Sequence, residues 1–138
     1  MPIYRIWADD TEGHTHLEAW SADALAFENG PGVFKGVGGT VLGNATRVML
    51  MRFEPGIDPP LHRANPGFAT LIEGELVIKV SDGTEVALAP GDALRIESLG
   101  IGRGGIGGWS PANPSKERTA LLALVQMPSK PKPEAPAT

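Results

Sequence analysis

Residues 69–80 read ATLIEGELVIKV, and this stretch decides the fold class. Its apolar run is interrupted in the middle by Glu73-Gly74. A glycine between two short apolar runs is typical of a tight turn between antiparallel strands. The run ends at residues 81–83, Ser-Asp-Gly, which tolerate the positive φ of a second turn. The stretch therefore predicts consecutive β-hairpins.

The rest of the chain repeats this pattern of short apolar runs divided by turns. The sequence contains 18 Gly and 13 Pro, and no amphipathic period is long enough for a substantial helix. Evenly spaced short strands favour a closed or double-sheet β-barrel, because such a barrel removes exposed sheet edges. The sequence therefore predicts an all-β fold. Further strands are predicted at 3–8, 14–20, 47–53, 85–89, 93–97 and 118–127, with one helical turn at 22–27.

The length of the chain fits a single domain. Its 138 residues are enough for one hydrophobic core and too few for two. We expect the β-barrel domain to occupy residues 1–127. Residues 128–138 are rich in proline and poor in large apolar side chains, which predicts a disordered tail.

Charge and composition argue against several kinds of partner. The 12 Lys and Arg against 16 Asp and Glu give a net charge of -4 without basic blocks, so we expect no nucleic acid partner. No stretch approaches the roughly 18 apolar residues of a membrane span. Residues 1–10 lack the pattern of a secretion signal, so we expect a cytoplasmic protein. The absence of cysteine excludes thiolate chemistry and cysteine-based metal sites.

Residues 47–126 resemble a cupin, the small jelly-roll barrel. Three segments carry the resemblance: Gly56 and His62 with five residues between them, IEGEL at 72–76, and LAPGDAL at 88–94. The resemblance implies a single-domain cupin jelly-roll.

The resemblance also implies a metal site, but this sequence departs from the metal-binding pattern. Where metal-binding cupins carry a second histidine, this chain has Ala64, and no carboxylate follows at 67–69. The position of the last histidine falls on Gly102. Because a transition metal needs about three such ligands, His62 alone does not hold one, and we expect no metal cofactor.

A metal-dependent alternative rests on histidines outside the cupin motifs. His14 and His16 lie two residues apart, so they share one face if their segment is a strand. Together with His62 they would form a three-histidine metal site. The alternative reading of the pair is a set of exposed or hydrogen-bonded histidines.

Without a metal, His62 is the candidate catalytic group of the barrel cavity. A histidine side chain accepts or donates a proton near neutral pH. Glu97 is the candidate carboxylate that would orient His62 or act as the second acid or base. Arg95 and Glu97 share one face of their predicted strand, so both face the cavity or both face solvent.

Further candidates for substrate binding are Arg52, Arg95, Arg103, Trp109 and His16. Arg103 lies beside the vacated histidine position, where a fixed cation would hold a carboxylate or enolate. Trp109 follows the glycine-rich residues 99–108, whose GxGxxG lacks the helix that a dinucleotide site requires. We interpret this stretch as a loop at the barrel mouth, with Trp109 as its apolar plug.

Two classes of function fit these residues, and both have a small molecule as the partner. The first is a lyase or isomerase that acts by proton transfer on a small, partly apolar carbonyl or hydroxyl compound, aromatic ones included. His62 and Glu97 would move the proton, and an arginine would stabilise the negative charge. The second is a non-catalytic small-molecule-binding or sensor domain, which needs only the cavity.

Residues 118–127, RTALLALVQM, are apolar on both faces of their predicted strand. A strand with one side in water would alternate with polar residues. We therefore expect a homodimer that forms through an edge strand or through the outer face of one sheet.

Overall fold

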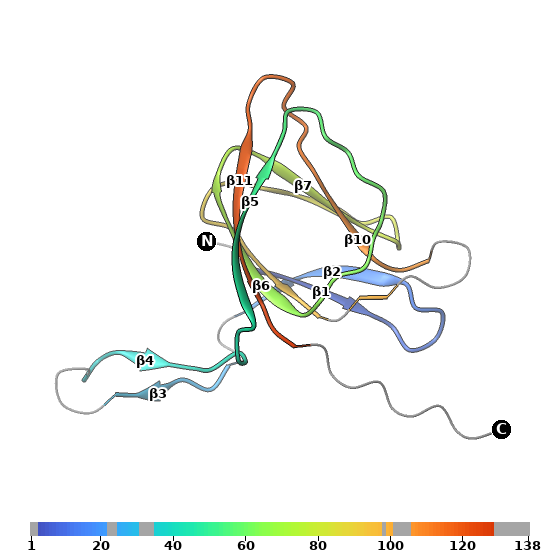
Figure 1. Cartoon of the computed structure of the whole chain (residues 1–138). Coiled ribbons are helices and arrows are strands. Elements are labelled where there is room, and N and C mark those ends of the chain that lie inside the picture. Colours follow the sequence, from blue (N-terminus) through green and yellow to red (C-terminus); the bar gives the residue numbers. More distant parts are fainter. Residues whose placement is uncertain (1–2, 22–24, 31–34, 98, 101–105, 129–138) are drawn as a thin grey trace.

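The computed structural model describes residues 3–21, 25–30, 35–97, 99–100 and 106–128 (Figure 1). The described residues form strands and connecting segments, which confirms the all-β prediction. None of them belongs to a helix that is long and apolar enough to span a membrane. The predicted helical turn at 22–27 falls partly on residues 22–24, outside the described residues. The strands are β1 (Ile3–Ala8), β2 (Thr15–Trp20), β3 (Glu28–Asn29), β4 (Gly38–Gly39), β5 (Arg47–Phe53), β6 (Gly67–Glu73), β7 (Leu76–Val80), β8 (Glu85–Leu88), β9 (Ala93–Ile96), β10 (Trp109–Ala112) and β11 (Ala120–Gln126).

Two larger sheets and one hairpin contain these strands. The six-stranded sheet has the order β2-β1-β9-β6-β11-β5, the three-stranded sheet has the order β10-β7-β8, and β3 pairs with β4. β1 runs parallel to β9, and the other pairs are antiparallel. Since no described strand pair joins the two larger sheets, they form an open double sheet. Of the two predicted alternatives, a closed barrel and a double-sheet barrel, the structure confirms the double-sheet form.

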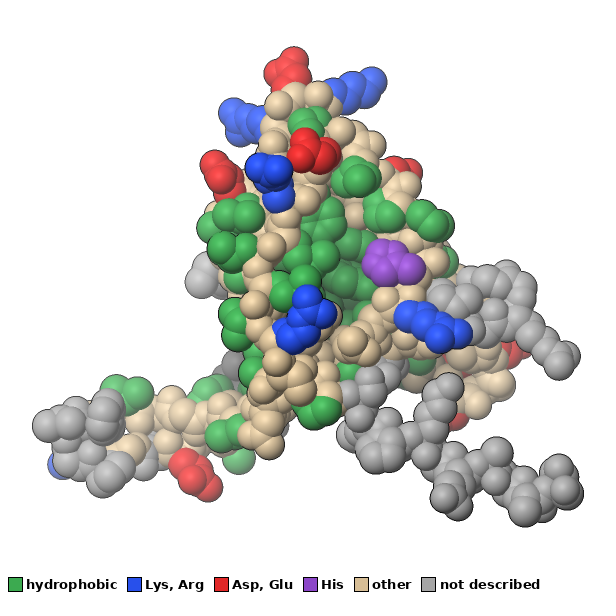
Figure 2. Space-filling view, viewed as in Figure 1, with side chains coloured by type: hydrophobic (Ala, Val, Ile, Leu, Met, Phe, Trp, Pro, Cys, Tyr) green, Lys and Arg blue, Asp and Glu red, His purple; other side chains and the backbone are tan. Residues whose placement is uncertain are grey.

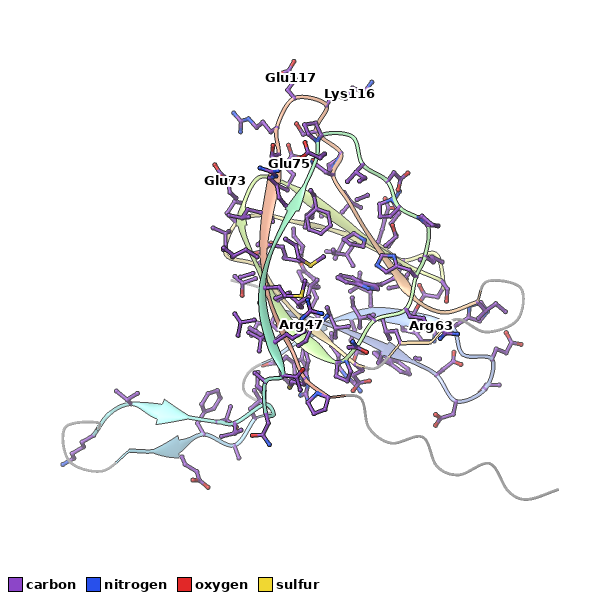
Figure 3. The ribbon with its side chains drawn as sticks, viewed as in Figure 1. Arg47, Arg63, Glu73, Glu75, Lys116 and Glu117 are labelled. Carbon is purple, nitrogen blue, oxygen red and sulfur yellow. The ribbon has the colours of Figure 1, made fainter. Side chains whose placement is uncertain are left out.

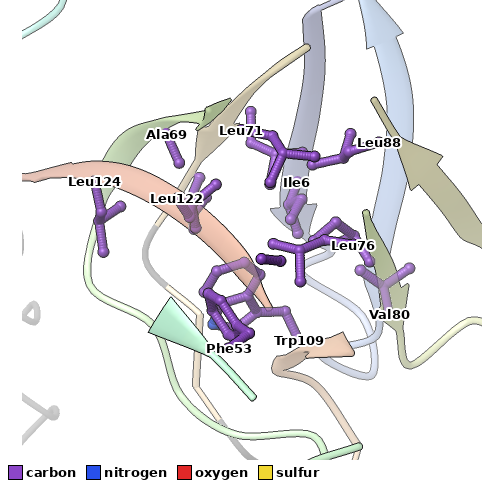
Figure 4. Packing of buried hydrophobic residues seen from close by; sticks show 14 of the residues in the cluster. Ile6, Phe53, Ala69, Leu71, Leu76, Val80, Leu88, Trp109, Leu122 and Leu124 are labelled. Carbon is purple, nitrogen blue, oxygen red and sulfur yellow. The ribbon is translucent and has the colours of Figure 1, made fainter. Parts of the chain in front are cut away.

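The core lies between the two larger sheets (Figure 4). Alternate residues of each strand point inward, as the pleat requires. Leu71 and Leu122 of the six-stranded sheet and Leu76 and Ile78 of the three-stranded sheet are fully buried. Phe53 and Trp109 add aromatic side chains to the same cluster. Side chains therefore fill the space between the sheets.

The hairpin predicted at Glu73-Gly74 joins β6 to β7. Gly74 has a φ of 85°, and a Cβ there would lie 2.7 Å from the Thr119 carbonyl oxygen. The chain therefore requires glycine at this turn, both for its backbone conformation and for its close approach to β11. The second predicted turn, at residues 81–83, joins β7 to β8.

β10 differs from the sequence-based expectation. Trp109, predicted as the plug of a loop, begins a strand that pairs with β7 and is only 4% exposed. Pro111 fits into this strand because β10 is the edge of its sheet, where a missing N–H costs no ladder bond. The sequence also gave no indication of the short strands β3 and β4.

The β3–β4 hairpin forms an arm that projects away from the two larger sheets (Figure 1). We define the arm as the described residues 25–30 and 35–45. It ends where Thr46 leads into β5. The arm pairs with itself, through Glu28 opposite Gly39 and Asn29 opposite Gly38.

Candidate functional site

His62 lies at the rim of a groove of about 300 Å³. Its backbone forms two 3.0 Å hydrogen bonds with Trp109, which fix the segment after β5 against β10. The Nδ1 atom lies 3.0 Å from the Pro60 carbonyl oxygen, so Nδ1 is the protonated nitrogen that donates. Met49 and Leu124 belong to the apolar lining, which Figure 2 shows as a hollow in this face of the molecule. Arg63 stands beside this hollow in Figure 3.

Glu97, the predicted partner of His62, lies on the outer side of the six-stranded sheet. Leu94 and Ile96 take the inward positions of β9 and are buried. The Glu97 carboxylate accepts hydrogen bonds of 2.9 and 3.3 Å from Arg5. This bond raises the pKa of Arg5 above its ordinary value. Glu97 lines a different cleft from His62, so the structure does not bring the two together.

The predicted substrate-binding arginines are also separate from the groove lining. Arg95 lies over the ring of Trp20, with 4.8 Å between the guanidinium carbon and the ring centroid. Arg52 is an exposed side chain that forms a 3.5 Å ion pair with Glu54. Arg103 lies outside the described residues.

Trp109 and His62 do meet in the structure. Their ring centroids lie 5.9 Å apart with a tilt of 50°. Trp109 is buried in the core cluster, whereas His62 is exposed. The contact therefore places the imidazole on the edge of the hydrophobic core.

His16 is held by two carboxylates that the sequence analysis did not identify. Its Nε2 lies 2.7 Å from Asp9 and its Nδ1 lies 2.8 Å from Asp82. Hydrogen bonding to Asp9 raises the pKa of His16, and the same bond lowers the pKa of Asp9 to about 2. Burial opposes the change at Asp82, but hydrogen bonds from Thr84 and His16 lower the pKa of its carboxyl. The ring of Trp7 packs against the imidazole at 4.6 Å.

The three histidines of the metal-dependent alternative do not converge. His14 lies 3.3 Å from Ser81, and both nitrogens of His16 are engaged by carboxylates. Among the residues that the structure describes, no group of three or more His, Cys, Asp or Glu side chains is placed to hold a metal ion. At the position implied by the cupin pattern, His62 stands with Ala64, whose methyl group offers no ligand. The described residues do not fit the metal of a cupin site.

Comparison with known proteins gives fold-level similarity only. No protein-family model matches the chain, and no curated protein matches it. The chain is similar to the Drosophila melanogaster CENP-C cupin domain, with 14% identity over 88% of this chain and 74% of that chain and a TM-score of 0.43. It is also similar to Drosophila melanogaster CENP-C bound to CAL1, with 15% identity over 88% and 79% of the two chains and a TM-score of 0.45. The two larger sheets of the chain fit the all-β jelly-roll architecture that the sequence predicts.

The prediction of a small-molecule partner is wrong. The partner in the similar CENP-C structure is CAL1, a protein.

The outer side of the six-stranded sheet is divided into a polar half and an apolar half. The polar half, over β2, β1 and β9, carries the Arg5 ion pairs and the stacked Arg95. The mainly apolar half lies over β6, β11 and β5, where Thr70 and Arg52 are the polar side chains on the outer side. Val48 and Phe68 stand opposite Val125, and Leu50 stands opposite Ala123. We name this half the outer apolar face, defined by Phe68, Ile72, Leu121, Ala123, Val125, Val48 and Leu50.

Three members of the outer apolar face are large apolar side chains that are exposed. Val48 is 77% exposed, Leu50 is 68% exposed and Ile72 is 48% exposed. Isolated exposed apolar residues are ordinary on protein surfaces, but a contiguous patch marks an interaction site. The apolar composition of residues 118–127 had pointed to this face, although the contributions of β5 and β6 required the strand order.

Proposed function

We propose that this chain is a non-catalytic assembly domain of cupin-type fold that forms a homodimer through its outer apolar face. The observation that carries the proposal is the row of exposed Val48 and Leu50 on β5, continuous with the apolar side chains of β11 and β6. Burial of a Val or Leu side chain stabilises an association by roughly 1.5–3 kcal/mol. Several such side chains are needed to offset the entropy lost on association.

The arrangement of β5 supports a second copy of the chain as the partner. β5 is the last strand of the six-stranded sheet, so one of its edges has no strand neighbour among the described residues. An apolar strand with a free edge associates readily with another strand or sheet. A two-fold axis near β5 would place the same surface of both copies in one interface, which is the self-complementary arrangement of most homodimers.

A lyase or isomerase reaction is not part of the proposal. Proton transfer by His62 needs a second acid or base, or an orienting carboxylate, at hydrogen-bond distance. The predicted carboxylate, Glu97, is engaged by Arg5 on the outer side of the sheet. His62 itself donates to the Pro60 carbonyl oxygen. No observation among the described residues therefore favours the reaction over assembly.

Sedimentation velocity over a range of concentrations tests the proposal. We expect a dimer at micromolar concentration for the unmodified chain and a monomer for Leu50→Glu, because a carboxylate within the outer apolar face would be desolvated in the interface. Ile57→Glu is the matched control, since Ile57 is also an exposed apolar residue, 44% exposed, but lies outside the outer apolar face. A monomer for the unmodified chain at all concentrations would refute the proposal.

A further inference from the structure

The arm carries apolar side chains that its own domain leaves uncovered. Phe27 is 51% exposed, Val37 is 59% exposed and Val41 is 85% exposed. The arm is held together by the short β3–β4 pairing and by a 3.0 Å hydrogen bond from Gly30 N–H to the Val37 carbonyl oxygen. An isolated two-stranded hairpin is marginally stable in water. The arm therefore requires a surface to pack on.

We infer that the arm of one copy packs on the outer apolar face of a second copy, so that the proposed homodimer is formed by reciprocal exchange of arms. This inference rests on the proposed dimer and specifies how it is built. Each copy carries one uncovered arm and one uncovered apolar face, and a two-fold exchange covers both at once. This closed arrangement leaves neither the arm nor the outer apolar face free to extend into a polymer.

The base of the arm fixes where it leaves the domain. Thr46 donates from its backbone N–H, at 2.8 Å, and from its hydroxyl, at 3.2 Å, to the Gln126 carbonyl oxygen. Leu42 and Asn44 line a cleft together with Met127 at this end of the sheet. The base is thus seated on its own domain, while β3 and β4 extend away from it (Figure 1).

The position of the arm supports a second copy of the chain as the partner whose arm packs on the outer apolar face. The arm continues directly into β5, whose Val48 begins the outer apolar face. An arm that leaves at the edge of one face and points outward reaches a neighbour that sits across a two-fold axis at that edge. The arm and the outer apolar face together supply about the 20–30 residues per side of a standard protein interface.

A complementation experiment tests the exchange. The arm variant is Phe27→Ser with Val37→Ser, and the face variant is Leu50→Glu. Both change exposed side chains, so circular dichroism and thermal unfolding should show that each variant keeps the fold. Ile57→Ser is the control for loss of an exposed apolar side chain outside the arm and the face.

We expect the arm variant and the face variant each to raise the dimer dissociation constant by at least about tenfold, with no change for the control. An equimolar mixture of the two variants should form a heterodimer more tightly than either variant associates alone. In that heterodimer the intact arm of the face variant packs on the intact face of the arm variant, so one of the two contacts is restored.

The other outcomes separate this inference from the proposed function. If the arm variant dimerises as tightly as the unmodified chain while the face variant does not, the dimer stands and the exchange is wrong. If both variants are monomers and the mixture forms no heterodimer, the arm of one copy does not pack on the face of the other and the exchange is also wrong. If the unmodified chain is a monomer, both proposals fail.

Discussion

His16 and Asp9 are joined across the β1–β2 turn, with 2.7 Å between Nε2 and Oδ2. The other imidazole nitrogen reaches Asp82 in the β7–β8 turn. The imidazole thus links one end of the six-stranded sheet to one end of the three-stranded sheet. Since the two sheets share no strand pairing, this polar contact supplements the packing that holds them together.

The first prediction concerns the pH dependence of this contact. Because the pKa of His16 is raised, its contribution to stability is complete below the ordinary histidine value of 6.5 and is lost as pH rises through the raised pKa. Because the pKa of Asp9 is lowered to about 2, its contribution is complete above 3.8 and is lost as pH falls toward 2. His16→Gln should therefore lower the thermal midpoint most between about pH 4 and 6.5.

Thermal unfolding of the unmodified chain, His16→Gln, Asp9→Asn and the double variant measures this prediction. The double variant should lose less than the sum of the two single losses, because the variants remove the same contact. Parallel pH profiles for the unmodified chain and His16→Gln would contradict the prediction.

The second prediction concerns Thr15, a fully buried polar residue. Its hydroxyl donates to the Gly108 carbonyl oxygen at 2.6 Å and accepts from the Ser81 N–H at 2.8 Å. Thr15→Val keeps the shape but leaves both backbone groups unpaired, so we expect a loss of about 1–3 kcal/mol in the free energy of unfolding. Thr119→Val is the exposed control and should change it by less than about 0.5 kcal/mol. Equal effects in denaturant titrations would rule out this role for Thr15.

The third prediction concerns Asn113, which is 2% exposed. Its Nδ2 donates to the carbonyl oxygens of Arg118 at 2.7 Å and Phe53 at 3.1 Å, which ties the β10–β11 connection to the end of β5. Asn113→Asp would turn a carboxylate oxygen toward these carbonyls and should cost at least about 2 kcal/mol. The loss should shrink at acidic pH, where a protonated carboxyl donates again.

Asn44→Asp is the control for this change, because Asn44 is exposed. Denaturant titrations of both variants at neutral and acidic pH provide the measurement. If Asn113→Asp lowers the free energy of unfolding no more than the control does, the predicted role of the Asn113 hydrogen bonds is contradicted.

The fourth prediction concerns the core between the sheets. Leu122 of β11 is fully buried and stands opposite Leu71 of β6. Leu122→Ala should cost about 2–5 kcal/mol, because it removes buried apolar contacts and leaves a cavity. Ile57→Ala, at an exposed position, should cost less than about 1 kcal/mol. Denaturant titration of the two variants decides whether the inward residues of β11 form the core.

The strands that the sequence predicts correctly are those whose pattern is local. The runs that became β5, β7 and β11 are short and apolar, and turn residues bound them. β10 was missed because it is stabilised by pairing with a strand that is distant in the sequence, and not by a local pattern. Trp109 to Ala112 pairs with β7, about 30 residues earlier in the chain. The local signal of Ser110-Pro111 is that of a loop, and only the position at a sheet edge makes a strand compatible with proline.

The candidate site was harder to predict than the fold. The alternation of side chains along a strand shows which residues share a face, but not which face points inward. Arg95 and Glu97 were correctly grouped on one face, but burial of Leu94 and Ile96 turned that face outward. The partners of His16 were missed for a different reason. Asp82 lies 66 residues away from His16, and no periodicity links two turns of different hairpins.

The place of β11 between β6 and β5 has a consequence for the order in which the molecule assembles. β11 is synthesised after all the other described strands, yet it is the only described strand that pairs with β5. β5 is complete once residue 53 has been synthesised. Its strand partner forms only after residues 120–126 have been synthesised. Such non-local pairing slows folding and leaves apolar strands exposed during synthesis. Nascent chains that stop before Ala120 would thus present β5 to chaperones or to one another.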